Sequence, residues 1–151
     1  MAAGLQVNFD KLQKFYIFLE TQIDNLPKDI FKKIDYYDSE ITLNEINPDL
    51  LDFIEIMEPY GSGNPEPLFI VNDLKIESIK ILKEKHILIF LINEFGSNIK
   101  AICFNCINTI LGDYLINFNK FKFALGCTII RDEFSNNEQP QLIVKDIMII
   151  D

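Results

Sequence analysis

The sequence predicts a mainly β protein with N-terminal helices, and three observations lead to this prediction. Before residue 59, apolar residues recur at steps of three and four, which is the period of an amphipathic helix. The segment PYGSGNPEP at 59–67 holds three prolines and two glycines, so it is a shaped connection through which no helix continues. After it, the apolar runs are rich in β-branched residues, which favours strands.

Two amphipathic helices are expected before this connection. The first begins near Asn8, a candidate N-cap, and ends at Leu26-Pro27. Its apolar stripe comprises Phe9, Leu12, Phe15, Tyr16, Leu19 and Ile23. The second begins near Pro48, and its apolar side comprises Leu50, Leu51, Ile54 and Met57. A brief extended segment is expected at 41–43. Two such helices cannot bury their stripes alone, so they need a sheet or a further partner.

Five strands and one helix are expected after the connection. The strands are expected at 68–82, 86–93, 99–104, 120–130 and 141–150. The helix is expected at 106–115, with Asn105 as its candidate cap, and a polar loop at 132–139 separates the last two strands. This βββαββ order predicts a five-stranded OB-fold barrel preceded by two amphipathic helices. An unrelated α+β sandwich is the alternative.

Composition limits the class of protein. A chain of 151 residues that is 48% hydrophobic can bury the core of one ordinary domain. The apolar run ILIFLI at 87–92 is too short to cross a bilayer, and the N-terminus lacks the pattern of a signal peptide. Three cysteines do not make a disulfide framework. We therefore expect a soluble, cytoplasmic protein without a membrane partner.

The net charge of −9 is unevenly distributed. Residues 1–66 hold 13 acidic and 5 basic residues, whereas residues 67–151 hold 10 acidic and 9 basic residues. The second part is nearly neutral and can present a basic face, because nucleic-acid binding follows local clusters of charge more than the total.

Three motifs together resemble a known family. They are AAGL at 2–5 followed by an amphipathic helix, PYGSGNPEP at 59–67 leading into Leu68-Phe69, and Glu84-Lys85-His86 opening a strand. The chain resembles, over essentially its whole length, the C-terminal part of RecJ, the family of bacterial single-stranded-DNA-specific 5′-to-3′ exonucleases of DNA repair and recombination. The most specific element is GSGNPEP at 61–67.

The resemblance implies a division of the chain. Residues 1–26 correspond to the last helix of the DHHA1 domain, residues 27–66 to a linker with a short helix and a Gly/Pro hinge, and residues 67–151 to the OB-fold domain. The hinge residues are Gly61, Gly63, Asn64, Pro65 and Pro67. We expect them to fix the angle between the DHHA1 and OB domains.

The same resemblance implies that this chain carries no catalytic residue. Family members hold their metal-binding aspartates and histidines in an N-terminal DHH domain, so Mg²⁺ or Mn²⁺ is implied for the full-length enzyme and no cofactor or metal for this part. The residues agree, because two-metal hydrolysis needs several converging carboxylates and histidines, and this chain has one histidine. The acidic group Asp35, Asp38 and Glu40 is better explained as a solvated turn. The C-x-x-C pair Cys103 and Cys106 is better explained as small buried hydrophobes.

Single-stranded DNA is the expected ligand of the barrel. OB folds receive single strands across strands 2 and 3 and on the loops between strands 1 and 2 and between strands 4 and 5, using cations for phosphates and aromatics for stacking. The DNA-binding candidates are Lys83, Lys85, His86, Lys100, Lys120, Lys122, Arg131 and Phe134, and Phe90 is a further candidate for stacking. For each of them, an ordinary place on the surface or in the core is the competing explanation.

A docking module is the alternative function. The acidic first half and the apolar residues Leu88, Phe90 and Ile92 could contact the DHH and DHHA1 domains of the exonuclease, a single-stranded-DNA-binding protein or a helicase. Salt separates the two hypotheses, since phosphate binding weakens steeply with ionic strength and apolar docking does not.

Overall fold

A computed structural model describes residues 4–27, 36–132 and 138–150, and these form two compact units. The first unit comprises residues 1–35 and the second residues 36–151. The predicted first helix lies in the first unit, as a 3₁₀ turn η1 (Phe9–Lys11) that leads into α1 (Leu12–Asp24). Asn8 occupies the cap position of η1, but its side chain makes no capping hydrogen bond. No residue of α1 is buried.

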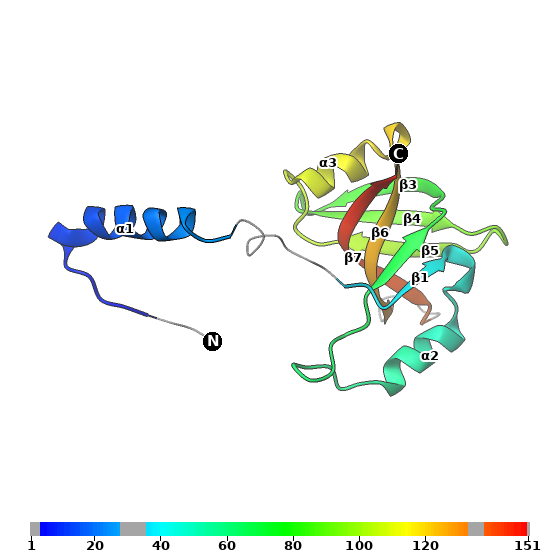
Figure 1. The fold of residues 1–151 in the computed structure, drawn as a ribbon. Coiled ribbons are helices and arrows are strands. Elements are labelled where there is room, and N and C mark those ends of the chain that lie inside the picture. Colours follow the sequence, from blue (N-terminus) through cyan, green and yellow to red (C-terminus); the bar gives the residue numbers. More distant parts are fainter. Residues whose placement is uncertain (1–3, 28–35, 133–137, 151) are drawn as a thin grey trace. The chain divides into compact units, whose positions relative to one another are not determined.

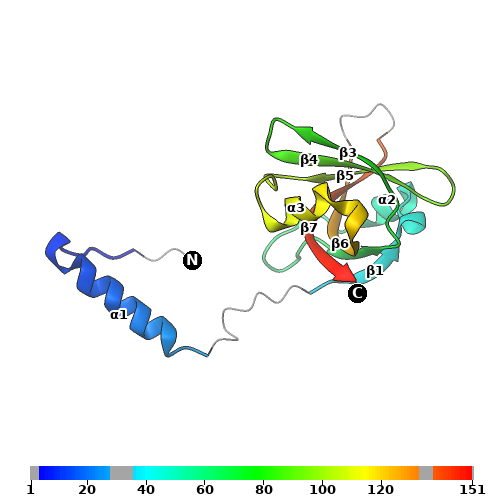
Figure 2. The same ribbon diagram turned by 90° about the horizontal axis from the view of Figure 1, so that it is seen from above.

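The second unit contains one curled sheet (Figures 1 and 2). Its elements are β1 (Ser39–Thr42), η3 (Leu43–Glu45), α2 (Pro48–Ile56), β2 (Phe69–Asn72), β3 (Ile76–Leu82), β4 (His86–Ile92), β5 (Asn98–Cys103), α3 (Ile110–Ile116), η4 (Phe118–Lys120), β6 (Lys122–Arg131) and β7 (Pro140–Ile150). Among the described residues the strand order is β1-β2-β6-β7-β5-β4-β3. The chain is therefore mainly β with an N-terminal helix, as predicted.

The sheet has seven strands, so the predicted number of five was wrong. The expected first strand at 68–82 is broken after Asn72, because Asp73 adopts a left-handed backbone with φ of 51°. Its first half, β2, pairs with β6, and its second half, β3, pairs with β4. The additional strand β1 pairs in parallel with β2. Because β2 and β3 are consecutive in the chain yet far apart in the strand order, the sheet has to curl.

Strand alternation builds the core. In β4 the inward residues Ile87, Ile89 and Leu91 are fully buried, while the residues between them are only partly buried. The parallel pair β5·β7 and the antiparallel pair β6·β7 bring Leu142 and Leu125 into the same core. This parallel pair joins β5, which precedes α3 in the chain, to β7, which follows it.

Two helices close the ends of the curled sheet (Figure 1). At one end, α2 inserts Leu51 and Ile54 into the core, and the side chain of Asn47 caps its N-terminus by accepting from the Leu50 amide at 2.9 Å. The predicted second helix is thus present. It belongs to the compact unit that starts at residue 36, whereas the sequence analysis placed residues 27–66 in a linker.

At the other end, α3 inserts Leu115 into the core. It begins at Ile110 with Thr109 as its cap, so the predicted start at 106 with an Asn105 cap was wrong. Asn105 and Asn108 both have positive φ, which no helix accommodates. Gly112 lets the helix pack on the preceding turn, because a Cβ there would lie 2.0 Å from the carbonyl oxygen of Cys106.

Candidate nucleic-acid interface

The outward side chains of four neighbouring strands form one continuous surface. On β4 the register places Leu88 between Lys80 of β3 and Ile102 of β5, and Phe90 beside Lys100 of β5. On the far side, Ile102 pairs with Ile143 of β7. We call this surface, made by the outward residues of β3, β4, β5 and β7 and by the β3–β4 turn, the outer face.

Lysines stand around the apolar centre of the outer face. Lys80 and Lys145 are exposed, and neither forms an ion pair within the part of the chain that the structure describes. Lys100 is paired with Asp132 at 2.8 Å, where the lysine side chain is partly exposed and the carboxylate is buried. The outer face therefore carries cations that can exchange water for phosphate oxygens at little cost.

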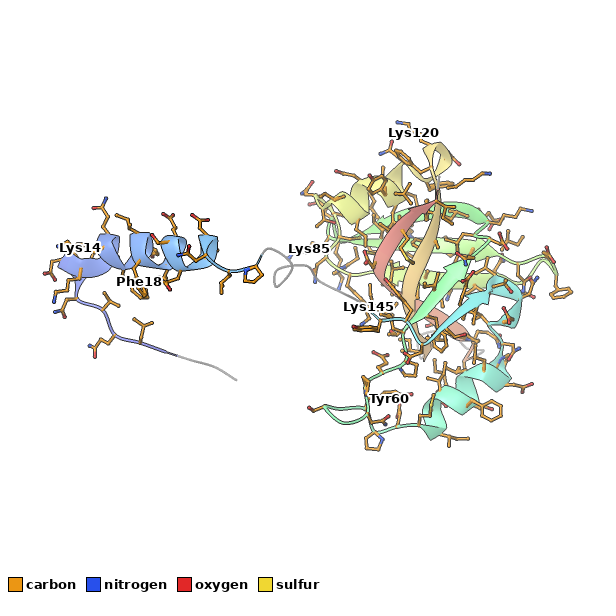
Figure 3. The ribbon with its side chains drawn as sticks, viewed as in Figure 1. Lys14, Phe18, Tyr60, Lys85, Lys120 and Lys145 are labelled. Atoms are coloured by element: carbon orange, nitrogen blue, oxygen red, sulfur yellow. The ribbon has the colours of Figure 1, made fainter. Side chains whose placement is uncertain are left out.

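The β3–β4 turn adds two more lysines. Lys83 and Glu84 both have positive φ, and the amide of Lys85 donates to the carbonyl of Leu82 at 3.1 Å. Leu82 pairs with His86, so a tight three-residue turn with a left-handed backbone at 83 and 84 joins the two strands. Such turns favour asparagine and glycine, so side chains of this length in left-handed backbone are uncommon. Lys83 and Lys85 are both exposed. Figure 3 shows Lys85 at the surface of the second unit.

An aromatic pair lies at the edge of the outer face next to this turn. His86 and Phe104 meet edge to face with ring centroids 5.4 Å apart. His86 is held by the amide of Asn105, which donates to its Nδ1 at 2.9 Å. Phe104 is 53% exposed, so about half of the residue is accessible to a ligand.

Sequence reasoning found part of the outer face and missed part. Lys83, Lys85, His86 and Lys100 lie on it. Lys80, Lys145 and Phe104 were not predicted, although Phe104 keeps the outward phase of Lys100 and Ile102 and could have been found from the strand alternation.

Arg131 was predicted to contact DNA, and the structure places it in an ion-pair cluster with α2. Its guanidinium donates to both carboxylate oxygens of Glu55 at 2.8 and 2.7 Å and to Asp52 at 2.8 Å. The hydrogen bonds from Arg131 lower the pKa of Glu55, and those to Glu55 and Asp52 raise the pKa of Arg131. Arg131 thus fastens α2 to the end of β6.

The remaining predicted residues lie elsewhere. Lys120 ends η4 and Lys122 begins β6. Figure 3 shows Lys120 at a different place on the second unit from Lys85. Phe134 lies outside the described residues.

The predicted hinge residues form a loop that is tied to α2. Gly61 and Asn64 exchange two backbone hydrogen bonds, of 2.8 and 3.1 Å. The Asn64 side chain donates to the carbonyl of Met57 at 2.7 Å and to that of Pro59 at 3.2 Å. Tyr60 donates its hydroxyl proton to the carbonyl of Ile54. Gly63, Pro65 and Pro67 complete the loop, and their role as a hinge stays a prediction.

No group of three or more metal-ligating side chains occurs within residues 4–27, 36–132 and 138–150. Asp38 accepts from the Leu68 amide at 2.9 Å and Glu40 accepts from the Asn72 side chain, so both join the start of β1 to β2. Cys103 and Cys106 are free and buried, and burial raises the pKa of Cys103.

Among the described helices, none is long and apolar enough to span a membrane.

Comparison with known proteins assigns this geometry to a family. The RecJ OB domain family matches residues 37–146, from the start of β1 to most of β7. The chain is also 29% identical over 154 aligned residues to the single-stranded-DNA-specific exonuclease RecJ of Haemophilus influenzae, an alignment that covers all of this chain and 26% of that relative. The chain thus spans about a quarter of the length of its curated relative. Because the family match covers most of its residues, the protein belongs to the RecJ OB-domain family.

Proposed function

We propose that the outer face binds single-stranded DNA for a RecJ-type exonuclease, and that this part of the enzyme contributes binding and no catalysis. The observation that supports the proposal most is the pattern of the outer face, where lysines surround exposed or half-exposed apolar and aromatic side chains. Proteins that hold single strands without sequence preference combine cations along the backbone with rings on which bases stack. The relative's name, single-stranded-DNA-specific exonuclease, agrees with this ligand.

Catalysis would belong to a metal-containing domain of the enzyme beyond this chain. The proposal assigns Mg²⁺ or Mn²⁺ and the hydrolytic step to a DHH domain, and it assigns to the outer face the task of keeping the strand engaged between cleavage steps. A role in DNA repair and recombination follows from the same proposal.

The salt dependence of binding tests the proposal quantitatively. Each phosphate contact to a single strand adds about 0.7 to the negative slope of log K against log salt, so four contacts from Lys80, Lys83, Lys85 and Lys145 give a slope of about −2.8. The measurement is fluorescence anisotropy of a labelled single strand, with a duplex of the same sequence beside it.

Charge-matched variants give this experiment its control. The double variant K80Q/K145Q should reduce the slope by about 1.4, because two phosphate contacts are lost. The double variant K11Q/K14Q removes the same charge from the first unit and should leave the slope unchanged. Equal effects of the two variants would refute the outer face as the binding surface.

Docking to other domains is a second candidate, which α1 favours. Tyr16, Ile17, Phe18 and Ile23 are exposed on a helix that buries no residue, and such apolar surface indicates a missing partner. The relative is about four times longer than this chain, so we propose the remainder of the exonuclease as that partner. If the protein binds no single strand even at low salt, docking becomes the better proposal.

A further inference from the structure

A cavity at the α3 end of the second unit lies away from the outer face. It has a volume of about 610 Å³, which is in the range of ligand pockets. Its walls are the break between β2 and β3, the η4 turn with the start of β6, and the last residue of β7. We call it the end pocket. Its lining includes Asp73, Lys75, Phe118, Asn119, Phe121 and Lys122.

The end pocket is cationic in an otherwise acidic chain. Lys75 and Lys122 line it and are exposed, and neither forms an ion pair within the described ranges. Asp73 is the one acidic residue on its walls. The local charge therefore favours an anionic ligand, although the whole chain carries −9.

An aromatic ring stands between this cavity and a second one. Phe121 lines both the end pocket and a neighbouring hollow of about 360 Å³, which also contains Lys120. Tyr114 contacts Phe121 edge to face, with centroids 5.0 Å apart, and this contact orients the Phe121 ring. Phe121 is nonetheless 41% exposed. A flat, oriented and accessible ring with lysines on both sides suits a base and its flanking phosphates.

We propose that the end pocket binds one nucleobase of a single strand, with Phe121 as the stacking surface and Lys75, Lys120 and Lys122 as phosphate contacts. This inference rests on the proposed function and adds a second contact to it. Asp73 and Asn119 supply hydrogen-bonding groups for a base edge.

A length series separates the two contacts. A strand of about 8 nucleotides can occupy one surface, whereas a strand of about 20 nucleotides can reach both, since one OB fold accommodates roughly 4 to 16 nucleotides. The variant F121A should weaken binding of the longer strand about 5- to 150-fold, as expected for the loss of one stacked base, and leave the shorter strand unaffected. K75Q/K122Q should act in the same direction, whereas K80Q/K145Q should weaken both lengths.

Direct occupancy can be measured because the chain has no tryptophan. The variant F121W places a single tryptophan, which can be excited selectively, at the end pocket, and the longer strand should quench it on stacking. The matched variant F53W places the fluorophore on α2, where Phe53 is 68% exposed, and should not respond. Thermal unfolding of each variant tests whether the fold is retained.

The outcomes distinguish the inference from the proposed function. If the wild type binds no strand of either length, both fail. If K80Q/K145Q weakens binding but F121A and K75Q/K122Q do not, or if F121W and F53W respond alike, the end-pocket inference is overturned and the outer face remains. If a synthetic peptide of alternating Asp and Phe quenches F121W and the long strand does not, the end pocket is a peptide site and the inference is wrong.

Discussion

Replacing Leu51 with alanine tests whether α2 is part of the fold or part of a linker. Leu51 is completely buried and belongs to the core cluster that also contains Ile54 and Ile129. Truncating a buried leucine costs about 2 to 5 kcal/mol through lost transfer energy and the cavity left behind, so we expect about 3 kcal/mol. With a urea slope of about 1.5 kcal/mol/M, the unfolding midpoint should fall by about 2 M. The melting temperature should fall by about 10 to 15 °C for a unit of this size.

The same helix offers a matched control. Phe53 lies two residues along α2 and is 68% exposed, so F53A should change the unfolding free energy by no more than about 0.5 kcal/mol. Both variants are measured by urea and thermal unfolding of the whole chain, followed by circular dichroism. If L51A were as stable as F53A, α2 would contribute nothing to the core, and residues 27–66 would behave as the linker that the sequence analysis expected.

Three further predictions concern packing and titration. G112A should destabilise the protein by about 1 to 3 kcal/mol in urea unfolding, because its Cβ would lie 2.0 Å from the carbonyl oxygen of Cys106 and the backbone must move; an unchanged midpoint would contradict this. Arg131 lowers the pKa of Glu55 in the folded state, so the pair stabilises the fold above the ordinary carboxyl pKa and loses this effect as pH falls through the lowered value. E55Q should accordingly have a lower melting temperature at pH 7, with a difference that shrinks in acid; a constant difference would exclude the linkage. Burial raises the pKa of Cys103, so iodoacetamide should alkylate it at pH 8 only after urea unfolding, and rapid labelling of the native protein would disprove its burial.

Most of the strands could be predicted because the signals for a strand, which are alternating apolar residues and a turn at its end, lie within the strand and its neighbouring residues. The alternation in 86–93, followed by the Glu94-Phe95-Gly96-Ser97 turn, predicts β4 and the start of β5 to within one residue. The break at Asp73 was missed although Asn72-Asp73 is a polar pair that favours a turn, because apolar residues resume at once with Leu74 and Ile76. The change of partner strand at this point is visible only in the structure.

The start of α3 was missed for a related reason. Ile107 has helical spacing to Ile110 and Leu111, and it does pack against the core, but it does so from an irregular turn. Asn105 and Asn108 have a left-handed backbone, which asparagine tolerates but does not require. Spacing alone therefore could not separate the turn from the helix.

The candidate site shows a different limit of sequence reasoning. Arg131 was predicted to bind phosphate from its place beside a loop, yet its partners Asp52 and Glu55 come from a helix 79 and 76 residues away in the chain. Neither Lys80 nor Lys145 belongs to a local motif. Lys80 joins the outer face through its register with Leu88, and Lys145 lies two residues beyond Ile143, in the same phase of β7. The alternation of inward and outward residues, followed along the strands on both sides of Lys100, would have predicted both lysines.

The distribution of acidic partners is compatible with the proposed binding of DNA by a chain whose net charge is −9. Asp52 and Glu55 are engaged with Arg131 at the α2 end of the second unit, and Asp132 is engaged with Lys100. The lysines of the outer face and the end pocket have no such partners in the described chain, except Lys100. At about 0.1 M salt, charges more than about 10 Å apart are largely screened, so an approaching phosphate responds to these lysines more than to the total charge. Charge balance on each surface, not in the whole chain, therefore decides whether the protein can bind DNA.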